Sequence, residues 1–177
     1  MSCSRLIIPP DQHVSLLKRL LPPRRRSEEA AFTFCRAQQA DGGVDFHFLE
    51  TYLVPSVEFN YRSLYGIELT DACRANVIKR ANDLDASLLE LHSHPRASTV
   101  EFSASDRSGF AEFVPPIWWR LKKKPYAAVV VGPRNFDSLS WITNAKRPDS
   151  ILDLQVGDRR LTPTGLTLEH WDQRYDF

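Results

Sequence analysis

The sequence has few of the features that mark secreted, membrane-spanning or nucleic-acid-binding proteins. Its only three cysteines, Cys3, Cys35 and Cys73, are too few and too scattered for a disulfide framework. Lysine plus arginine number 23 and aspartate plus glutamate 22, so the net charge of +1 provides no global basic field for nucleic acid. No apolar run approaches the roughly 20 residues that a helix needs to cross a bilayer, and residues 1–10 do not resemble a secretory signal. We therefore expect a cytoplasmic protein with no membrane or nucleic-acid partner.

The composition is that of a globular protein. Hydrophobic residues make up 42% and charged residues 25% of the 177 residues. This length predicts a single domain over residues 1–177 that can bury a hydrophobic core without disulfides.

Hydrophobic periodicity and turn residues predict an α/β domain with a mixed sheet flanked by helices. Asp11 is expected to start a helix that ends at Pro22-Pro23, and Asp41-Gly42-Gly43 to join two strands. Tyr126–Gly132 is the strongest strand, since its nearly continuous valine and alanine suit burial on both faces. The segment 57–69 fits either a strand or a folded-over loop. The other expected elements are strands over 30–37, 44–54 and 139–143, helices over 71–84 and 103–114, a hairpin over 151–161 and a docked tail over 165–177, with Pro115-Pro116 ending the second of these helices.

The most informative segment is His92-Ser93-His94-Pro95, followed by Ser103-Ala104-Ser105-Asp106. Two histidines at i and i+2 at the end of a strand point to the same side, so both imidazoles can reach one ion. An aspartate in the first turn of the following helix can return to the same point. Two nitrogens, one oxygen and an open position for water are the ligand set of a hydrolytic zinc site. We therefore expect one Zn²⁺ per chain, held by His92, His94 and Asp106.

A hydrolytic site of this kind also needs a general base and a group that stabilises the oxyanion. Ser103 lies within one helical turn of Asp106, so its hydroxyl could donate to an oxyanion beside the metal. A glutamate from elsewhere in the chain must take a proton from the attacking water and pass it to the leaving amine. Glu90 and Glu101 are nearby carboxylates, and Glu90 shares the alternation of the two histidines, which would suit a supporting role.

These residues resemble the JAMM/MPN+ metalloprotease family, whose signature is a distant glutamate, then His-x-His-Pro, then Ser-x-x-Asp. In that family the glutamate stands just before the first core strand, ahead of a small residue. Glu28-Glu29-Ala30-Ala31-Phe32 fits this description. The resemblance favours Glu28 as the catalytic residue, since choosing Glu29 shifts the pattern by one position. The spacing from His94 to Ser103 is one residue longer than the family usually has.

The resemblance covers roughly residues 10–145 and implies the JAMM/MPN fold, which has a cytidine deaminase-like architecture. It implies a zinc-dependent isopeptidase or peptidase that cleaves after the C-terminus of a ubiquitin-like protein. The compact length is similar to that of prokaryotic JAB-type proteins, which implies partners among ubiquitin-activating and ubiquitin-conjugating homologues and a role in modifier removal or antiviral defence. The flexible tail of the modifier would bind in an extended groove beside 57–69 and the segment after Pro95.

Three other functions stay open at this point. The chain could be a partner-binding scaffold of the same fold, although its ligand set is complete. It could be a nucleic-acid-associated protein like the RadC group, which shares the motif, although the near-neutral charge argues against this. It could also be a different zinc hydrolase that acts on a small amide.

Overall fold

The computed structural model describes residues 4–24 and 26–173. Its helices are interspersed among the strands along the chain, with a 3₁₀ turn at Ser56–Glu58. The helices are α1 (Pro10–Leu20), α2 (Asp71–Asp83), α3 (Ala104–Arg120) and α4 (Leu166–Glu169). The strands are β1 (Ser4–Ile8), β2 (Ala30–Ala40), β3 (Gly43–Leu53), β4 (Phe59–Arg62), β5 (Ile67–Leu69), β6 (Ser87–Ser93), β7 (Tyr126–Val131), β8 (Phe136–Trp141), β9 (Leu152–Val156) and β10 (Arg159–Leu161).

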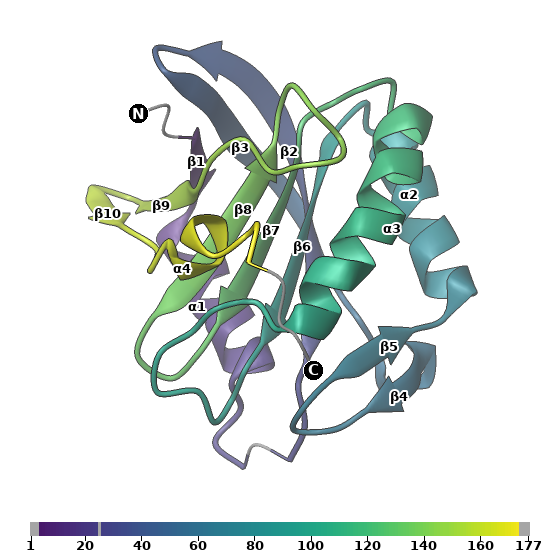
Figure 1. The fold of residues 1–177 in the computed structure, drawn as a ribbon, viewed down its shortest axis with the longest axis vertical. Coiled ribbons are helices and arrows are strands. Elements are labelled where there is room, and N and C mark those ends of the chain that lie inside the picture. The colour runs from purple at the N-terminus through teal and green to yellow at the C-terminus, as the bar shows by residue number, and fades with distance from the viewer. Residues whose placement is uncertain (1–3, 25, 174–177) are drawn as a thin grey trace.

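Eight of these strands form one mixed, curled sheet in the order β10-β9-β1-β3-β2-β6-β7-β8 (Figure 1). The pairs β1–β3, β1–β9 and β6–β7 are parallel and the other pairs are antiparallel. The curl brings β8 beside the start of β9, where Ser138 Oγ donates to the carbonyl of Leu152 at 2.8 Å. The expected α/β class with a mixed sheet is confirmed. The sheet also includes β1, for which no strand is expected, and β9 and β10, which form the hairpin expected over 151–161.

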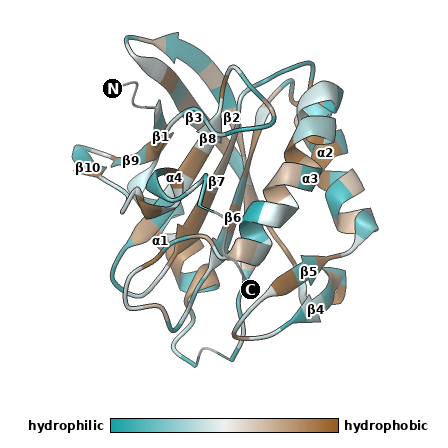
Figure 2. Cartoon of the chain, viewed as in Figure 1, coloured by the Kyte–Doolittle hydropathy of each residue, from teal (hydrophilic) through white to brown (hydrophobic). Residues whose placement is uncertain are grey.

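The sheet is buried on both faces. Along β7, Tyr126, Ala128 and Val130 belong to one hydrophobic cluster, with α2 and α3, while Ala127, Val129 and Val131 belong to a second cluster with α1. This alternation explains the continuous apolar run of β7, and Figure 2 shows the apolar residues concentrated in the central strands. Cys35 and Cys73 are buried in these clusters, as expected; Cys3 lies outside the described residues.

One helix is longer than the sequence predicts. The expected end of the helix at Pro115-Pro116 is wrong, because α3 continues to Arg120 with both prolines inside it. A proline in a helix interior costs about 3 kcal/mol. Burial of Val114 and Ile117 on the sheet side stabilises the continuation by roughly 1.5–3 kcal/mol for each side chain.

Strand pairing defines two other segments. The segment 57–69, which fits either a strand or a folded-over loop from its sequence, forms a 3₁₀ turn and the β4–β5 hairpin. This hairpin is a separate two-stranded sheet. Residues 4–8, for which the sequence predicts no element, form a strand because they pair on both sides, with β3 and β9. No helix in the described part of the chain is long and apolar enough to cross a membrane.

The tail docks on the sheet through a buried carboxylate. Asp137 of β8 is fully buried and accepts hydrogen bonds from the backbone of Gly165 and Thr167 at 2.9 Å and from the Thr167 hydroxyl at 2.6 Å. Trp171 packs against Trp141 at a ring distance of 6.1 Å. The docking expected for 165–177 is therefore confirmed over its described residues, and 174–177 lie outside them.

Candidate metal centre

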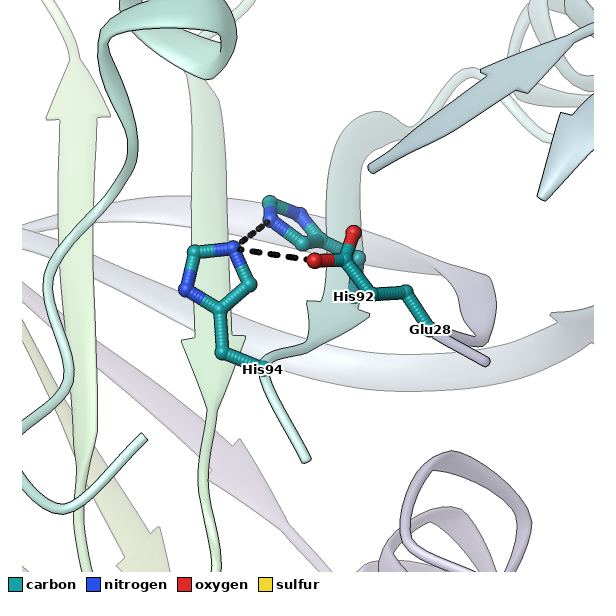
Figure 3. Close-up of side chains that lie close together, drawn as sticks. All are labelled: Glu28, His92 and His94. Atoms are coloured by element: carbon teal, nitrogen blue, oxygen red, sulfur yellow. Dashed lines mark hydrogen bonds and ion pairs between the residues drawn. The ribbon is translucent and has the colours of Figure 1, made fainter. Parts of the chain in front are cut away.

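The register of β2 and β6 brings Glu28 beside His94. Ala30 pairs with His92, and Ser93 N donates to the carbonyl of Glu29 at 3.0 Å. Two residues further along this antiparallel register, Glu28 lies opposite His94. His94 follows the last residue of β6, and its N–H donates to the carbonyl of Val131 at 2.8 Å. Figure 3 shows the three side chains directed toward one another.

The N-terminus of α3 brings Asp106 to the same point. Ser103 is the N-cap residue, and its backbone N–H and its hydroxyl both donate to Asp106 Oδ2, at 2.8 and 2.7 Å. Asp106 N donates back to Ser103 Oγ at 3.1 Å, which completes a capping box. This reciprocal cap fixes the carboxylate of Asp106 so that Oδ2 lies 3.5 Å from His92 Nε2 and 3.4 Å from His94 Nε2.

The ligand atoms have the spacing of a tetrahedral zinc site. Glu28, His92 and His94 form a group that could hold a metal ion, with one ligand atom from each lying within 4.8 Å of the others. The two Nε2 atoms are 3.3 Å apart, and Asp106 Oδ2 lies at almost the same distance from each. Bonds of about 2.0–2.1 Å place neighbouring ligands about 3.3 Å apart around tetrahedral zinc. Glu28 Oε1 lies further away, at 3.7 Å from His94 Nε2.

Burial and opposite charges shift the ionisation of these groups. Burial alone would lower the pKa of His92, but the carboxylates of Asp106 and Glu28 raise it to about 9. Burial would raise the pKa of Asp106, but His92, His94 and the Ser103 hydroxyl hold it well below its usual range. Burial raises the pKa of Glu28, and the two histidines oppose this only partly. The same carboxylates that favour a positive charge on His92 would favour a bound metal cation, which binds the neutral imidazole.

Two buried polar atoms at this centre lack hydrogen-bond partners among the described residues. They are Glu28 Oε2 and His92 Nδ1, on side chains of residues that are only 3% and 2% exposed. Buried polar groups are nearly always satisfied, so Glu28 Oε2 is available to a bound water or substrate, whereas His92 Nδ1 lies on the other edge of the ring from Nε2, which faces His94 and Asp106. The two imidazole nitrogens and the carboxylate of Asp106 have the spacing of zinc ligands. Glu28 Oε2, which has no hydrogen-bond partner in the described chain, is available to a water bound beside them.

The structure separates Glu28 from the other candidate carboxylates. Glu29 forms a two-oxygen contact with Arg62 at 2.8 and 2.9 Å, which holds the β4–β5 hairpin against the start of β2. Glu90 accepts a hydrogen bond from Tyr126 at 2.9 Å, and Glu101 lies 3.3 Å from His170. Among these glutamates, Glu28 is the one placed beside His94.

Supporting residues of the centre gave no signal in the sequence. Ser93 Oγ accepts from Glu29 N at 3.0 Å, and the carbonyl of Ser63 accepts from Glu28 N at 2.6 Å. Phe102, immediately before the cap, stacks near His92 at a ring distance of 5.6 Å, and its N–H donates to Thr167 Oγ1 at 2.8 Å. These contacts join segments far apart in the chain, so no local pattern reveals them.

Comparison with protein-family models and with curated proteins finds no match for the chain. Any function assigned to it therefore depends on the chemistry of this centre.

Proposed function

We propose that the protein is a zinc-dependent hydrolase that cleaves the isopeptide or peptide bond after the C-terminus of a ubiquitin-like protein. The observation that carries this proposal is the spacing of His92, His94 and Asp106 at 3.3–3.5 Å from one another, with Glu28 beside them. The motif resemblance to the JAMM/MPN+ family supplies the substrate class. Ubiquitin-activating and ubiquitin-conjugating homologues in a prokaryotic cytoplasm are the partners that this resemblance implies.

Zinc, when bound by His92, His94 and Asp106, would lower the pKa of a coordinated water toward about 7 and polarise the substrate carbonyl. Glu28 takes a proton from the attacking water through its unpartnered Oε2 and later gives it to the leaving amine. Its raised pKa suits a group that must hold this proton between the two steps. The buried Glu28 is anchored by its backbone N–H to Ser63 and cannot move far from His94.

Ser103 has two roles available to it. In the structure its hydroxyl donates to Asp106 Oδ2, as a cap and a support of the ligand. If the hydroxyl rotates, it can donate to an oxyanion formed at the metal, because the backbone N–H of Ser103 still holds Asp106.

Metal removal tests the function directly. The zinc-loaded protein, incubated with ubiquitin-like fusions, should release the free modifier, and mass spectrometry should place the cut after its C-terminal residue. A chelator should abolish cleavage and added zinc should restore it. Absence of cleavage of every fusion by the zinc-loaded protein would contradict the proposal. Small amides are assayed in parallel. Cleavage of these amides and of no fusion would show that the substrate is a small amide and not a ubiquitin-like protein.

Ser103→Ala should lower kcat by roughly 10²–10³-fold while zinc content and KM hardly change, because an oxyanion donor acts in the transition state. The same change removes an N-cap and should cost about 1 kcal/mol of stability. Turnover, metal analysis and thermal melting measure the three effects. Ser108→Ala, at an exposed position of α3, is the matched control. A lower melting temperature with full turnover would leave Ser103 as a cap only.

A further inference from the structure

A cavity of about 290 Å³ borders the metal centre on the side of Glu28 and His94. Leu64 and Tyr65, in the turn of the β4–β5 hairpin, form an apolar wall, and Arg96 supplies a positive charge. Tyr65 is 81% exposed, so its ring is available to a bound molecule. The cavity thus combines an apolar wall and a guanidinium beside the reacting groups.

Arg96 is free to bind a ligand. Within residues 4–24 and 26–173, no hydrogen bond or ion pair engages its exposed side chain. Arg62, by contrast, forms an ion pair with Glu29. A guanidinium without a partner can form two parallel hydrogen bonds to a carboxylate without first breaking an ion pair.

The loop that carries Arg96 is fixed at both ends. Ala97 N donates to the carbonyl of His94 at 3.2 Å, directly after the metal-binding motif. Further along, Val100 is fully buried, its N–H donates to Asn135 Oδ1 at 3.1 Å, and its carbonyl accepts from the Thr164 hydroxyl at 2.8 Å. Gly132 leaves the space that Val100 fills, since a Cβ at this position would collide with it. The backbone of Arg96 therefore has a fixed position relative to the metal ligands.

The second cavity at the centre is more acidic. It has a volume of about 340 Å³ and borders His92 and Asp106. Besides these two residues, its charged lining consists of Glu68, Asp71, Glu90 and Arg74. Arg74 is already engaged, because its guanidinium lies 3.9 Å from Glu90 and over the ring of Phe113 at 4.0 Å. An acidic group of a substrate is therefore repelled more strongly from this cavity than from the cavity of Arg96, where, among the described residues, Glu28 is the one carboxylate in the lining and the guanidinium has no partner.

We propose that Arg96 binds an acidic side chain of the substrate, located within two residues of the cleaved bond. This inference rests on the proposed function and names a specificity determinant of the same site. The carboxylate pairs with the guanidinium, while the methylene groups of a glutamate or aspartate contact Tyr65 and Leu64. A charge-assisted pair of this kind at a partly exposed site corresponds to a preference of roughly tenfold.

Cleavage of a peptide library by the zinc-loaded full-length protein tests this. Mass spectrometry identifies the cleaved peptides, and kcat/KM is then measured for the best peptide and for its partner with glutamine in place of glutamate. The wild type should prefer the acidic peptide roughly tenfold. Arg96→Glu should reverse the preference, and Arg36→Glu, an exposed arginine on β2, should leave it unchanged.

The outcomes separate this inference from the proposed function. Cleavage with equal kcat/KM for the two peptides, or an Arg96→Glu variant that keeps the acidic preference, overturns the role of Arg96 and leaves the hydrolase intact. A preference for lysine or arginine near the cleaved bond also overturns it. No cleavage of peptides or ubiquitin-like fusions by the zinc-loaded protein overturns both. The melting temperature of Arg96→Glu should equal that of the wild type, because residue 96 is exposed.

Discussion

Glu28→Gln is expected to retain close to one zinc per chain and to lose turnover by roughly 10²–10⁴-fold, which is the usual contribution of a general base. Glutamine has nearly the same size and cannot accept the proton of the attacking water. The substitution also removes a carboxylate whose pKa is raised by burial, so it should not lower the melting temperature. Metal analysis, thermal melting and kcat on a ubiquitin-like fusion measure the three quantities.

Glu29→Gln is the matched control for this variant. The carboxylate of Glu29 is paired with Arg62 at 2.8 Å, outside the group of metal-binding atoms. Its loss should weaken the attachment of the β4–β5 hairpin and leave turnover within a few-fold of the wild type. Loss of zinc from Glu28→Gln would instead make Glu28 a metal ligand. Full turnover in Glu28→Gln would show that it is not the base.

The features of the centre that could be predicted are local ones. His92 and His94 are two residues apart at the end of β6, and Ser103 and Asp106 share one helical turn. For both pairs the spacing in sequence determines the spacing in space. The histidines and the aspartate therefore meet where the motif indicates, although the loop between them has an extra residue. Hydrogen bonds from Ala97 N to the carbonyl of His94 and from Val100 N to Asn135 Oδ1 anchor that loop.

The features that could not be predicted depend on pairing between distant segments. The register of β2 on β6 places Glu28, and not Glu29, beside His94, and no single-strand pattern specifies this register. The strand over residues 4–8 is stabilised by two neighbours, one of them about 150 residues away in the sequence. The continuation of α3 through Pro115-Pro116 depends on the burial of its apolar face against the sheet, which outweighs the local penalty of proline.

Loss of any one metal ligand is expected to remove both zinc binding and turnover. His92→Ala, His94→Ala and Asp106→Ala should each reduce zinc from close to one per chain to near zero and should abolish turnover, because two remaining ligands leave an incomplete site. The ligand variants should also lose the stabilisation that bound metal provides. A chelator should therefore lower the melting temperature of the wild type and leave that of the variants unchanged.

Asp106 allows the ligand role to be separated from the helix cap. In Asp106→Asn the side-chain oxygen can still accept the hydrogen bond from Ser103 N, so the capping box that begins α3 is largely retained. The neutral amide is a much poorer zinc ligand than a carboxylate whose pKa lies well below the usual range. Both variants lose the charged contact of Asp106 with His92 and His94, so the metal-free melting temperature should fall for both, and it should fall less for Asp106→Asn, which keeps the cap, than for Asp106→Ala. Both variants should lose zinc. Full zinc content in His94→Ala or in Asp106→Asn would contradict the assignment of the three ligands, and Glu28, at 3.7 Å from His94, would then be the ligand to test.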